Sequence, residues 1–259
     1  MWPVTGRQVV VIGVASSAGT SSARNVATAV RIARTVADAD SGRSPTVRCR
    51  SFSVATAASA SSPARNATSR PPGCFTWTGT PDLATPATTS SGVLDAMGTA
   101  HLLGLADTEL ARLGVDVPML TDERLALIGY DETDPETFAA EVQRDRPTLV
   151  RFPDHQVRAD PAGCARAAIA ALEQHISSLV VQFDVGAADS RDLPLANFPH
   201  YGTGIALDAA EALAILCTAP TLAAIVLTEV NPSYDPAGHQ LARYVDTVAA
   251  AIGHGLTRH

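Results

Sequence analysis

The sequence contains no lysine, so all 19 of its basic residues are arginines. This absence excludes a phosphate-loop lysine, a Schiff-base or pyridoxal-phosphate lysine and the strand lysine of protein kinases. No apolar run approaches the roughly 18 residues that a membrane span needs. Charged residues make up only 17% of the 259 residues and hydrophobic residues 46%, which is enough apolar material for a large core. The composition predicts a globular protein without a membrane segment.

Cysteine is also scarce, and its spacing excludes two common kinds of site. The four cysteines lie far apart and form no CxxC pair: Cys49, Cys74, Cys164 and Cys217. Zinc ribbons and thioredoxin-type redox motifs are therefore excluded. We expect isolated, reduced thiols in the core.

The charge is acidic overall but unevenly distributed. A net charge of −7 and a pI of about 5.4 argue against a general nucleic-acid binder. The first 80 residues hold nine arginines and only two acidic residues, a composition that can resemble a transit peptide. However, residues 8–14 have a buried-strand pattern that comes too early for a discarded leader, and there is no apolar signal region with a cleavage site. We therefore predict a cytoplasmic protein.

Short apolar or β-branched runs alternate with alanine-rich stretches, which is typical of βαβ units with a parallel sheet. The expected strands are residues 8–14, 74–78, 125–129, 148–152, 179–185 and 222–230, and the expected helices are residues 22–37, 94–105, 135–144, 161–175, 207–217 and 240–252. The helix predicted at residues 161–175 has the strongest sequence signals for its start, because Asp160 can cap it and Pro161 suits its first turn. We predict an α/β fold: three αβα layers around a mainly parallel sheet.

Residues 40–73 are the atypical stretch. They are dominated by Ser, Ala, Arg, Pro and Thr, with almost no large apolar residue. Such a composition indicates either a long mobile surface segment or poorly formed structure. No clean linker divides the rest, so we predict a single domain over residues 1–259.

Three acidic residues lie at the ends of predicted strands or shortly after them: Asp82, Asp184 and Glu229. Ligands of open α/β sheets bind beyond the carboxyl ends of the strands, so these side chains are candidates for one site. Glu229 follows a deeply apolar strand, and Asn231-Pro232 stops that strand, so we expect its side chain to face a cleft. Taken singly, each acid is more often a helix cap or a solvated surface group.

Several segments resemble motifs of the arginase/agmatinase family of ureohydrolases. Residues 181–186 are similar to the family's Ser-Phe-Asp-Val-Asp segment, and residues 229–232 to its Glu-Val-Asn-Pro segment. Residues 77–97 resemble the strand and loop that usually read Phe-Asp-Ala-His-x-Asp and then Asn-Thr-Pro-x-Thr-Thr-x-Ser-Gly. Weaker likenesses lie at residues 12–19 and 201–205. The resemblance implies an arginase-like fold, a small guanidino or amidino ligand, and a homo-oligomer (trimer or hexamer) or an assembly with an active paralogue.

The metal ligands that the resemblance implies are mostly replaced. The family's activity needs two manganese ions bridged by carboxylates, which convert bound water to hydroxide. Asp82 and Asp184 match two of the six ligand positions. The others fall on residues that do not hold a divalent ion: Phe52, Thr78, Thr80 and Gly186. We expect no cofactor, or manganese only if other residues rebuild the site; His200 is the histidine best placed to approach the cleft.

Other family positions imply catalytic and substrate-binding residues. The usual histidine of the substrate-facing loop falls on Asp95, an acid that can move protons and is our catalytic candidate. Thr89 and Ser91 match the loop that binds the α-amino and carboxylate groups of arginine, although Ala84 replaces an asparagine there. Glu229 matches the guanidinium-facing glutamate, and Asp131 is a further substrate-facing acid. Ordinary turn chemistry would explain the same residues.

Three interpretations follow. The first is a ureohydrolase-fold pseudoenzyme with a degraded dimanganese site, which binds a guanidino ligand or a partner subunit. The second is an active hydrolase or lyase on C–N bonds of guanidino or amidino compounds, with a rebuilt or unrecognised site. The third is a chain with a damaged N-terminal half and no selected activity, because residues 21–73 look like GC-rich coding sequence read out of frame.

Overall fold

The computed structural model describes residues 2–4, 7–13, 71–112, 117–134, 146–204 and 210–256. The helices predicted at 22–37 and 135–144 lie outside these residues, as do Phe52 and nearly all of the atypical stretch 40–73. All the candidate site residues with acidic or hydroxyl side chains lie within them.

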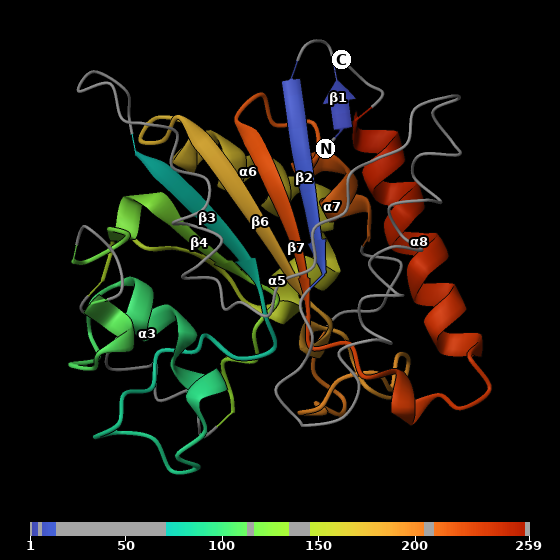
Figure 1. Cartoon of the computed structure of the whole chain (residues 1–259), viewed down its shortest axis with the longest axis horizontal. Coiled ribbons are helices and arrows are strands. Elements are labelled where there is room, and N and C mark those ends of the chain that lie inside the picture. Colours follow the sequence, from blue (N-terminus) through green and yellow to red (C-terminus); the bar gives the residue numbers. More distant parts are fainter. Residues whose placement is uncertain are drawn as a thin grey trace.

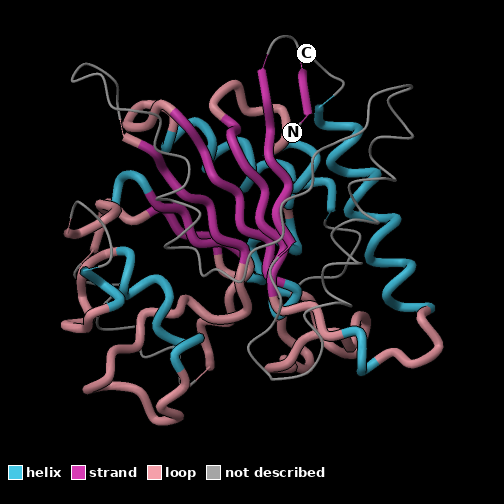
Figure 2. The backbone as a smooth tube through the Cα atoms, viewed as in Figure 1, coloured by secondary structure: helices cyan, strands magenta, loops and turns pink. Residues whose placement is uncertain are grey.

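The described residues form a seven-stranded sheet in the order β1-β2-β7-β6-β3-β4-β5 (Figures 1 and 2). The strands are β1 (Trp2–Val4), β2 (Arg7–Gly13), β3 (Pro72–Trp77), β4 (Leu125–Ile128), β5 (Val150–Phe152), β6 (Ser178–Asp184) and β7 (Leu222–Thr228). All neighbouring pairs from β2 to β5 are parallel, and only the edge strand β1, which the sequence did not predict, pairs antiparallel. The predicted mainly parallel α/β fold is confirmed.

The central strands are buried on both faces, as their continuous apolar sequences predict. On one face, Phe75, Val181 and Ile225 belong to a core that also contains residues of α5 (Asp154–Ala159), α6 (Pro161–Leu172), α7 (Ala210–Leu216) and α8 (His239–Leu256). On the other face, Cys74 and Val180 share a second core with Leu102 of α3 (Gly98–Leu102). Figure 1 shows α5, α6 and α7 behind the sheet and α3 apart from them, near the ends of the strands.

The helix after Asp160 forms as predicted. The Asp160 carboxylate accepts a hydrogen bond of 2.7 Å from the Gly163 N–H, and Pro161 lies in the first turn. The helix predicted at 94–105 is shorter: residues 94–97 form a 3₁₀ turn, and α3 ends at Leu102, just before Gly104 at φ +66°. Helix α5 was not predicted, and α7 is seen only from Ala210.

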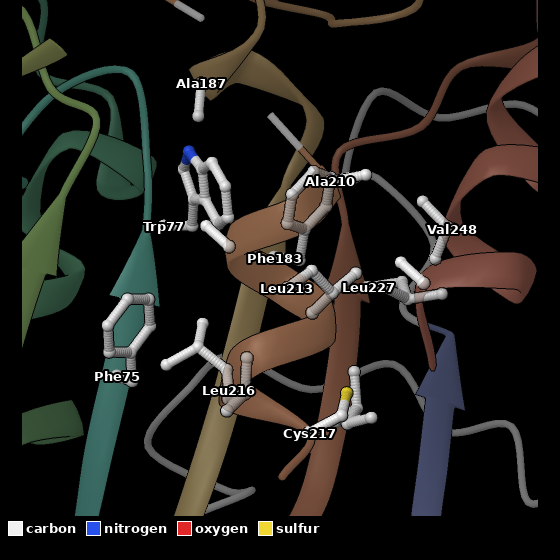
Figure 3. Packing of buried hydrophobic residues seen from close by; sticks show 14 of the residues in the cluster. Phe75, Trp77, Phe183, Ala187, Ala210, Leu213, Leu216, Cys217, Leu227 and Val248 are labelled. Carbon is white, nitrogen blue, oxygen red and sulfur yellow. The ribbon is translucent and has the colours of Figure 1, made fainter. Parts of the chain in front are cut away.

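The main core is built around aromatic residues on neighbouring strands (Figure 3). The rings of Trp77 and Phe183 meet edge to face with centroids 4.9 Å apart, and Tyr244 of α8 lies beyond Phe183. The three described cysteines, Cys74, Cys164 and Cys217, are buried and not in disulfides, as predicted. Within the described part of the chain, no helix has both the length and the apolar character that crossing a membrane requires.

Substitutions at two glycines, Gly129 and Gly253, test the packing around Trp77. Gly129 follows β4 with φ +86°, and an added Cβ would lie 2.6 Å from Nε1 of the buried Trp77. We expect Gly129→Ala to lower the free energy of unfolding by about 2 kcal/mol or more, through backbone strain and overpacking.

Gly253→Ala is the control, since this helical glycine of α8 has open space at its Cβ. It should raise the free energy of unfolding by about 0.5–1 kcal/mol. Urea denaturation of both variants checks the pair, and equal stabilities would contradict the packing described for Trp77.

Candidate active site

A cavity of about 140 Å³ opens where β3, β6 and β7 end. Its described titratable lining residues are Asp82, Asp95, Asp134, Asp184, His200 and Glu229. Parallel strands present their carboxyl ends at one edge of the sheet, and this common edge brings together acids that are up to 147 positions apart in the sequence. The loops that follow the strands gather below the sheet in Figure 1.

Asp82 is held by two threonines, at positions where the family resemblance implies metal ligands. Thr80 donates its hydroxyl hydrogen bond to one carboxylate oxygen at 2.6 Å, and Thr78 donates to the other at 3.2 Å. Burial, followed by the charge of Asp95, raises the pKa of Asp82 well above its usual range, and the charge of Asp184 adds to this. The hydroxyl groups oppose the rise only in part. The Asp82 backbone has φ +51°, a left-handed conformation that costs a non-glycine residue about 1 kcal/mol.

Asp184 ends β6 and is almost fully buried. One carboxylate oxygen accepts from the Gly186 N–H at 2.6 Å and the other from the Thr228 hydroxyl at 2.8 Å, while Gln182 donates to the same hydroxyl. Burial is the largest cause that raises the pKa of Asp184 to about 8, and the charges of Glu229 and Asp95 follow. This carboxyl group thus holds a proton near neutral pH.

Glu229 follows β7 directly and also adopts a left-handed conformation, with φ +62°. Its Oε2 accepts a hydrogen bond of 2.7 Å from the side chain of Asn197, and Asn231 in turn donates to the oxygen of Asn197 at 2.7 Å. Burial raises the pKa of Glu229, and the Asn197 hydrogen bond opposes that rise. The side chain lines the cavity, as its position before Asn231-Pro232 predicted.

Asp95 interacts electrostatically with the other three acids, Asp82, Asp184 and Glu229. It lies in the 3₁₀ turn of residues 94–97, where it lines the cavity and is still exposed to solvent. Partial burial raises its own pKa, and its charge raises the pKa of Asp82, Asp184 and Glu229. A cation placed beside Asp95 would therefore lower four pKa values together.

The remaining predicted residues lie differently. Ser91 lines the cavity, but Thr89 is not among its lining residues, and both hydroxyls accept hydrogen bonds from N–H groups of their own loop, at Gly92 and Val93. Asp131 is buried beside the cavity, where burial opposes its ionisation. Hydrogen bonds from the hydroxyl and the N–H of Thr133, together with Thr203 and His200, outweigh that burial and lower the pKa of Asp131. Asp131 is thus engaged in turn formation.

Several lining residues were missed or given little weight by sequence reasoning, among them Asp134, Ala196, Phe198 and His200. His200 packs its ring against Gly79, where an added Cβ would lie 2.7 Å from the ring, and its Nδ1 is 3.9 Å from the Asp134 carboxylate. Ala196 and Phe198 come from the same loop as His200. Asp134 could have been found, because it closes the acidic turn after β4, whereas nothing in the local sequence marks Ala196 or Phe198.

No family model matches the sequence, and no curated protein has significant sequence similarity to it. Solved structures do match. An arginase from Bacillus subtilis subsp. subtilis str. 168 aligns with a TM-score of 0.61 and 21% identity over 72% of this chain, which spans 62% of that arginase. A further Bacillus subtilis arginase structure gives 0.72 and 16% over 98% of this chain and 99% of that one.

A third match is an Entamoeba histolytica arginase in complex with L-ornithine. It aligns with a TM-score of 0.64 and 17% identity over 88% of this chain and 76% of that arginase. The chain has the arginase fold. Sequence identities of 16–21% show that this chain shares its fold with these arginases, and they show no more than the fold. Among the described residues of this arginase fold, no group of three or more His, Cys, Asp or Glu side chains is arranged to hold a metal ion.

The raised pKa of Asp184 predicts how stability varies with pH. Since the group's pKa is about 8 in the folded chain and near 3.8 when unperturbed, only the folded state keeps this proton between those values. Its contribution to stability is fully present below pH 3.8 and is lost as the pH rises toward 8, by up to about 1.4 kcal/mol per pH unit.

We therefore expect Asp184→Asn to flatten the fall in the free energy of unfolding between pH 5 and pH 8. Urea denaturation across that range measures it. Glu211→Gln, which changes an exposed acid on α7, should keep the wild-type slope. A slope in Asp184→Asn equal to that of the wild type would show that Asp184 ionises normally.

Proposed function

We propose that this chain is a divergent ureohydrolase-family pseudoenzyme that binds a small guanidinium or amidinium compound without turning it over. The observation that carries the proposal is the convergence of Asp82, Asp95, Asp184 and Glu229 on one small cavity. Burial raises the pKa of each of these carboxyl groups, and the charges of neighbouring acids raise it further for Asp82, Asp184 and Glu229. A bound organic cation would relieve that repulsion, so the cavity favours such a ligand.

Glu229 is the residue best placed to hold a guanidinium. Asn197 occupies only Oε2, and Oε1 accepts no hydrogen bond from the described residues. Asn197 is fixed by Asn231, so the glutamate side chain is oriented before any ligand arrives. A planar guanidinium can donate two parallel hydrogen bonds to a carboxylate, a directional contact that needs no metal. In this proposal Asp95 supplies a second negative charge at the mouth of the cavity.

The described donor set does not fit a pair of manganese ions. At the replaced ligand positions, the hydroxyls of Thr78 and Thr80 donate to Asp82 and so use the oxygens that a metal would need. Gly186 offers no side chain, and an added Cβ would stand 3.0 Å from an oxygen of Asp184. These contacts favour the pseudoenzyme over an active C–N hydrolase, and no hydrolytic step is assigned to the cavity.

Titration calorimetry tests ligand binding. Arginine, agmatine and guanidinobutyrate would be titrated into the wild type and into Glu229→Ala. Loss of a charge-assisted hydrogen-bond pair should weaken binding by about tenfold to a hundredfold.

Glu211→Ala on the exposed face of α7 is the matched control for this titration and should bind like the wild type. No binding to the wild type, or equal binding by Glu229→Ala, would remove Glu229 from the proposed function.

Metal content separates the proposal from the alternative of an active hydrolase. After purification in manganese-supplemented buffer and gel filtration, elemental analysis should find well under one manganese per chain, since no three of the described His, Cys, Asp or Glu side chains are arranged to hold an ion. Incubation with arginine or agmatine should release no urea. Stoichiometric manganese or urea release would contradict the pseudoenzyme.

We further propose that the protein is cytoplasmic. The likeness to arginases supports a homo-oligomer (trimer or hexamer) or, as the alternative, an assembly with an active paralogue.

A further inference from the structure

The lining of the cavity combines two kinds of residue. Asp82, Asp184 and Glu229 contribute carboxylates, whereas Val93, Ala196 and Phe198 are apolar. Phe198 is 46% exposed, and it is the one member of the exposed large hydrophobic residues that lines the cavity in the described part of the chain. A half-exposed aromatic ring beside an acidic cavity offers an apolar surface to whatever enters.

The loop that carries Phe198 is fixed on both sides of this residue. Ala196 forms an antiparallel bridge with Val230, and Asn197 is hydrogen-bonded to both Glu229 and Asn231. On the other side, the His200 carbonyl accepts a hydrogen bond of 2.8 Å from the Ser190 N–H. The loop that carries Phe198 is therefore held beside Glu229 by the network that orients this glutamate.

The charges of the cavity oppose a ligand with a carboxylate. Among the described lining residues, five are acidic and none is an arginine, so His200 is the sole group there that can become positive. The carboxylate of Asp134 lies 3.9 Å from Nδ1 of His200, so a positive charge on that ring would be paired with Asp134 and not with a ligand. Thr89 and Ser91 use their hydroxyls within their own loop rather than presenting them to a ligand. Within the described lining, a ligand carboxylate would thus meet repulsion without a compensating arginine.

We propose that the cavity selects guanidinium or amidinium ions whose substituent is apolar and carries no carboxylate, with Phe198 as the residue that determines this specificity. This inference rests on the proposed function, and it adds that amino-acid guanidines such as arginine are poor ligands. The cation faces Glu229, and the apolar substituent lies against Phe198 on its way out of the cavity. Burying a phenyl substituent against Phe198 should strengthen binding roughly tenfold over a methyl group.

Titration calorimetry with three compounds tests the cation, the apolar substituent and the carboxylate separately. The compounds are methylguanidine, benzylguanidine and 4-(guanidinomethyl)benzoate. For the wild type, benzylguanidine should bind roughly tenfold more tightly than each of the other two. Phe198→Ala should remove the advantage over methylguanidine, whereas Phe198→Leu should keep most of it because it retains apolar surface. Tyr201→Ala is the matched control: Tyr201 is an exposed aromatic residue three positions on, outside the described lining, and its loss should leave all three affinities unchanged.

The outcomes distinguish this inference from the function on which it rests. Binding of methylguanidine without any gain for benzylguanidine, or a gain that survives in Phe198→Ala, overturns the role of Phe198 while guanidinium binding stands. Equal binding of the benzoate and benzylguanidine overturns the exclusion of carboxylates. If no probe binds the wild type, the proposed function fails and the selectivity fails with it.

Discussion

Carboxylates from three parallel strands share one small cavity, and the rest of the site follows from the free energy of keeping them there. Buried carboxylates repel one another and lose the water that stabilises their charge, so proton uptake is favoured. The pKa of Asp184 reaches about 8 for this reason, and that of Asp82 is also well above its usual range. A cation close to these groups would favour their charged forms and lower their pKa values.

The surrounding residues reduce this electrostatic penalty without removing it. Hydroxyl and N–H groups from Thr78, Thr80, Thr228 and Gly186 satisfy the oxygens of the two aspartates. In an enzyme with two manganese ions, the positive charge of the metals would offset the repulsion between the carboxylates. Under the proposed function, hydroxyl donors at the ligand positions that the family resemblance implies would let the carboxylate cluster persist without the ions. The arginase fold and the proposed loss of turnover are compatible for this physical reason.

Backbone strain is concentrated at the same place. Asp82 and Glu229 are the two non-glycine residues with positive φ in the described part of the chain, and both line the cavity. Such conformations persist only where neighbouring contacts hold them. For Glu229 those contacts come from Asn197 and the loop that carries Phe198, so the proposed cation site and the proposed selectivity share one hydrogen-bond network.

The sequence by itself determined the parallel sheet, the capped helix after Asp160 and the position of Asp82, Asp184 and Glu229 at strand ends. Apolar runs, cap residues and strand-stopping prolines act locally, and parallel strands necessarily end at one edge. Tertiary structure decided which groups face those acids. Asp134, His200 and Phe198 reach the cavity because long-range contacts fold their loops over it, and α3 is shorter than its pattern because the chain turns at Gly104. Loop conformation depends on partners far away in the sequence, such as Val230 for Ala196, and no local periodicity encodes such partners.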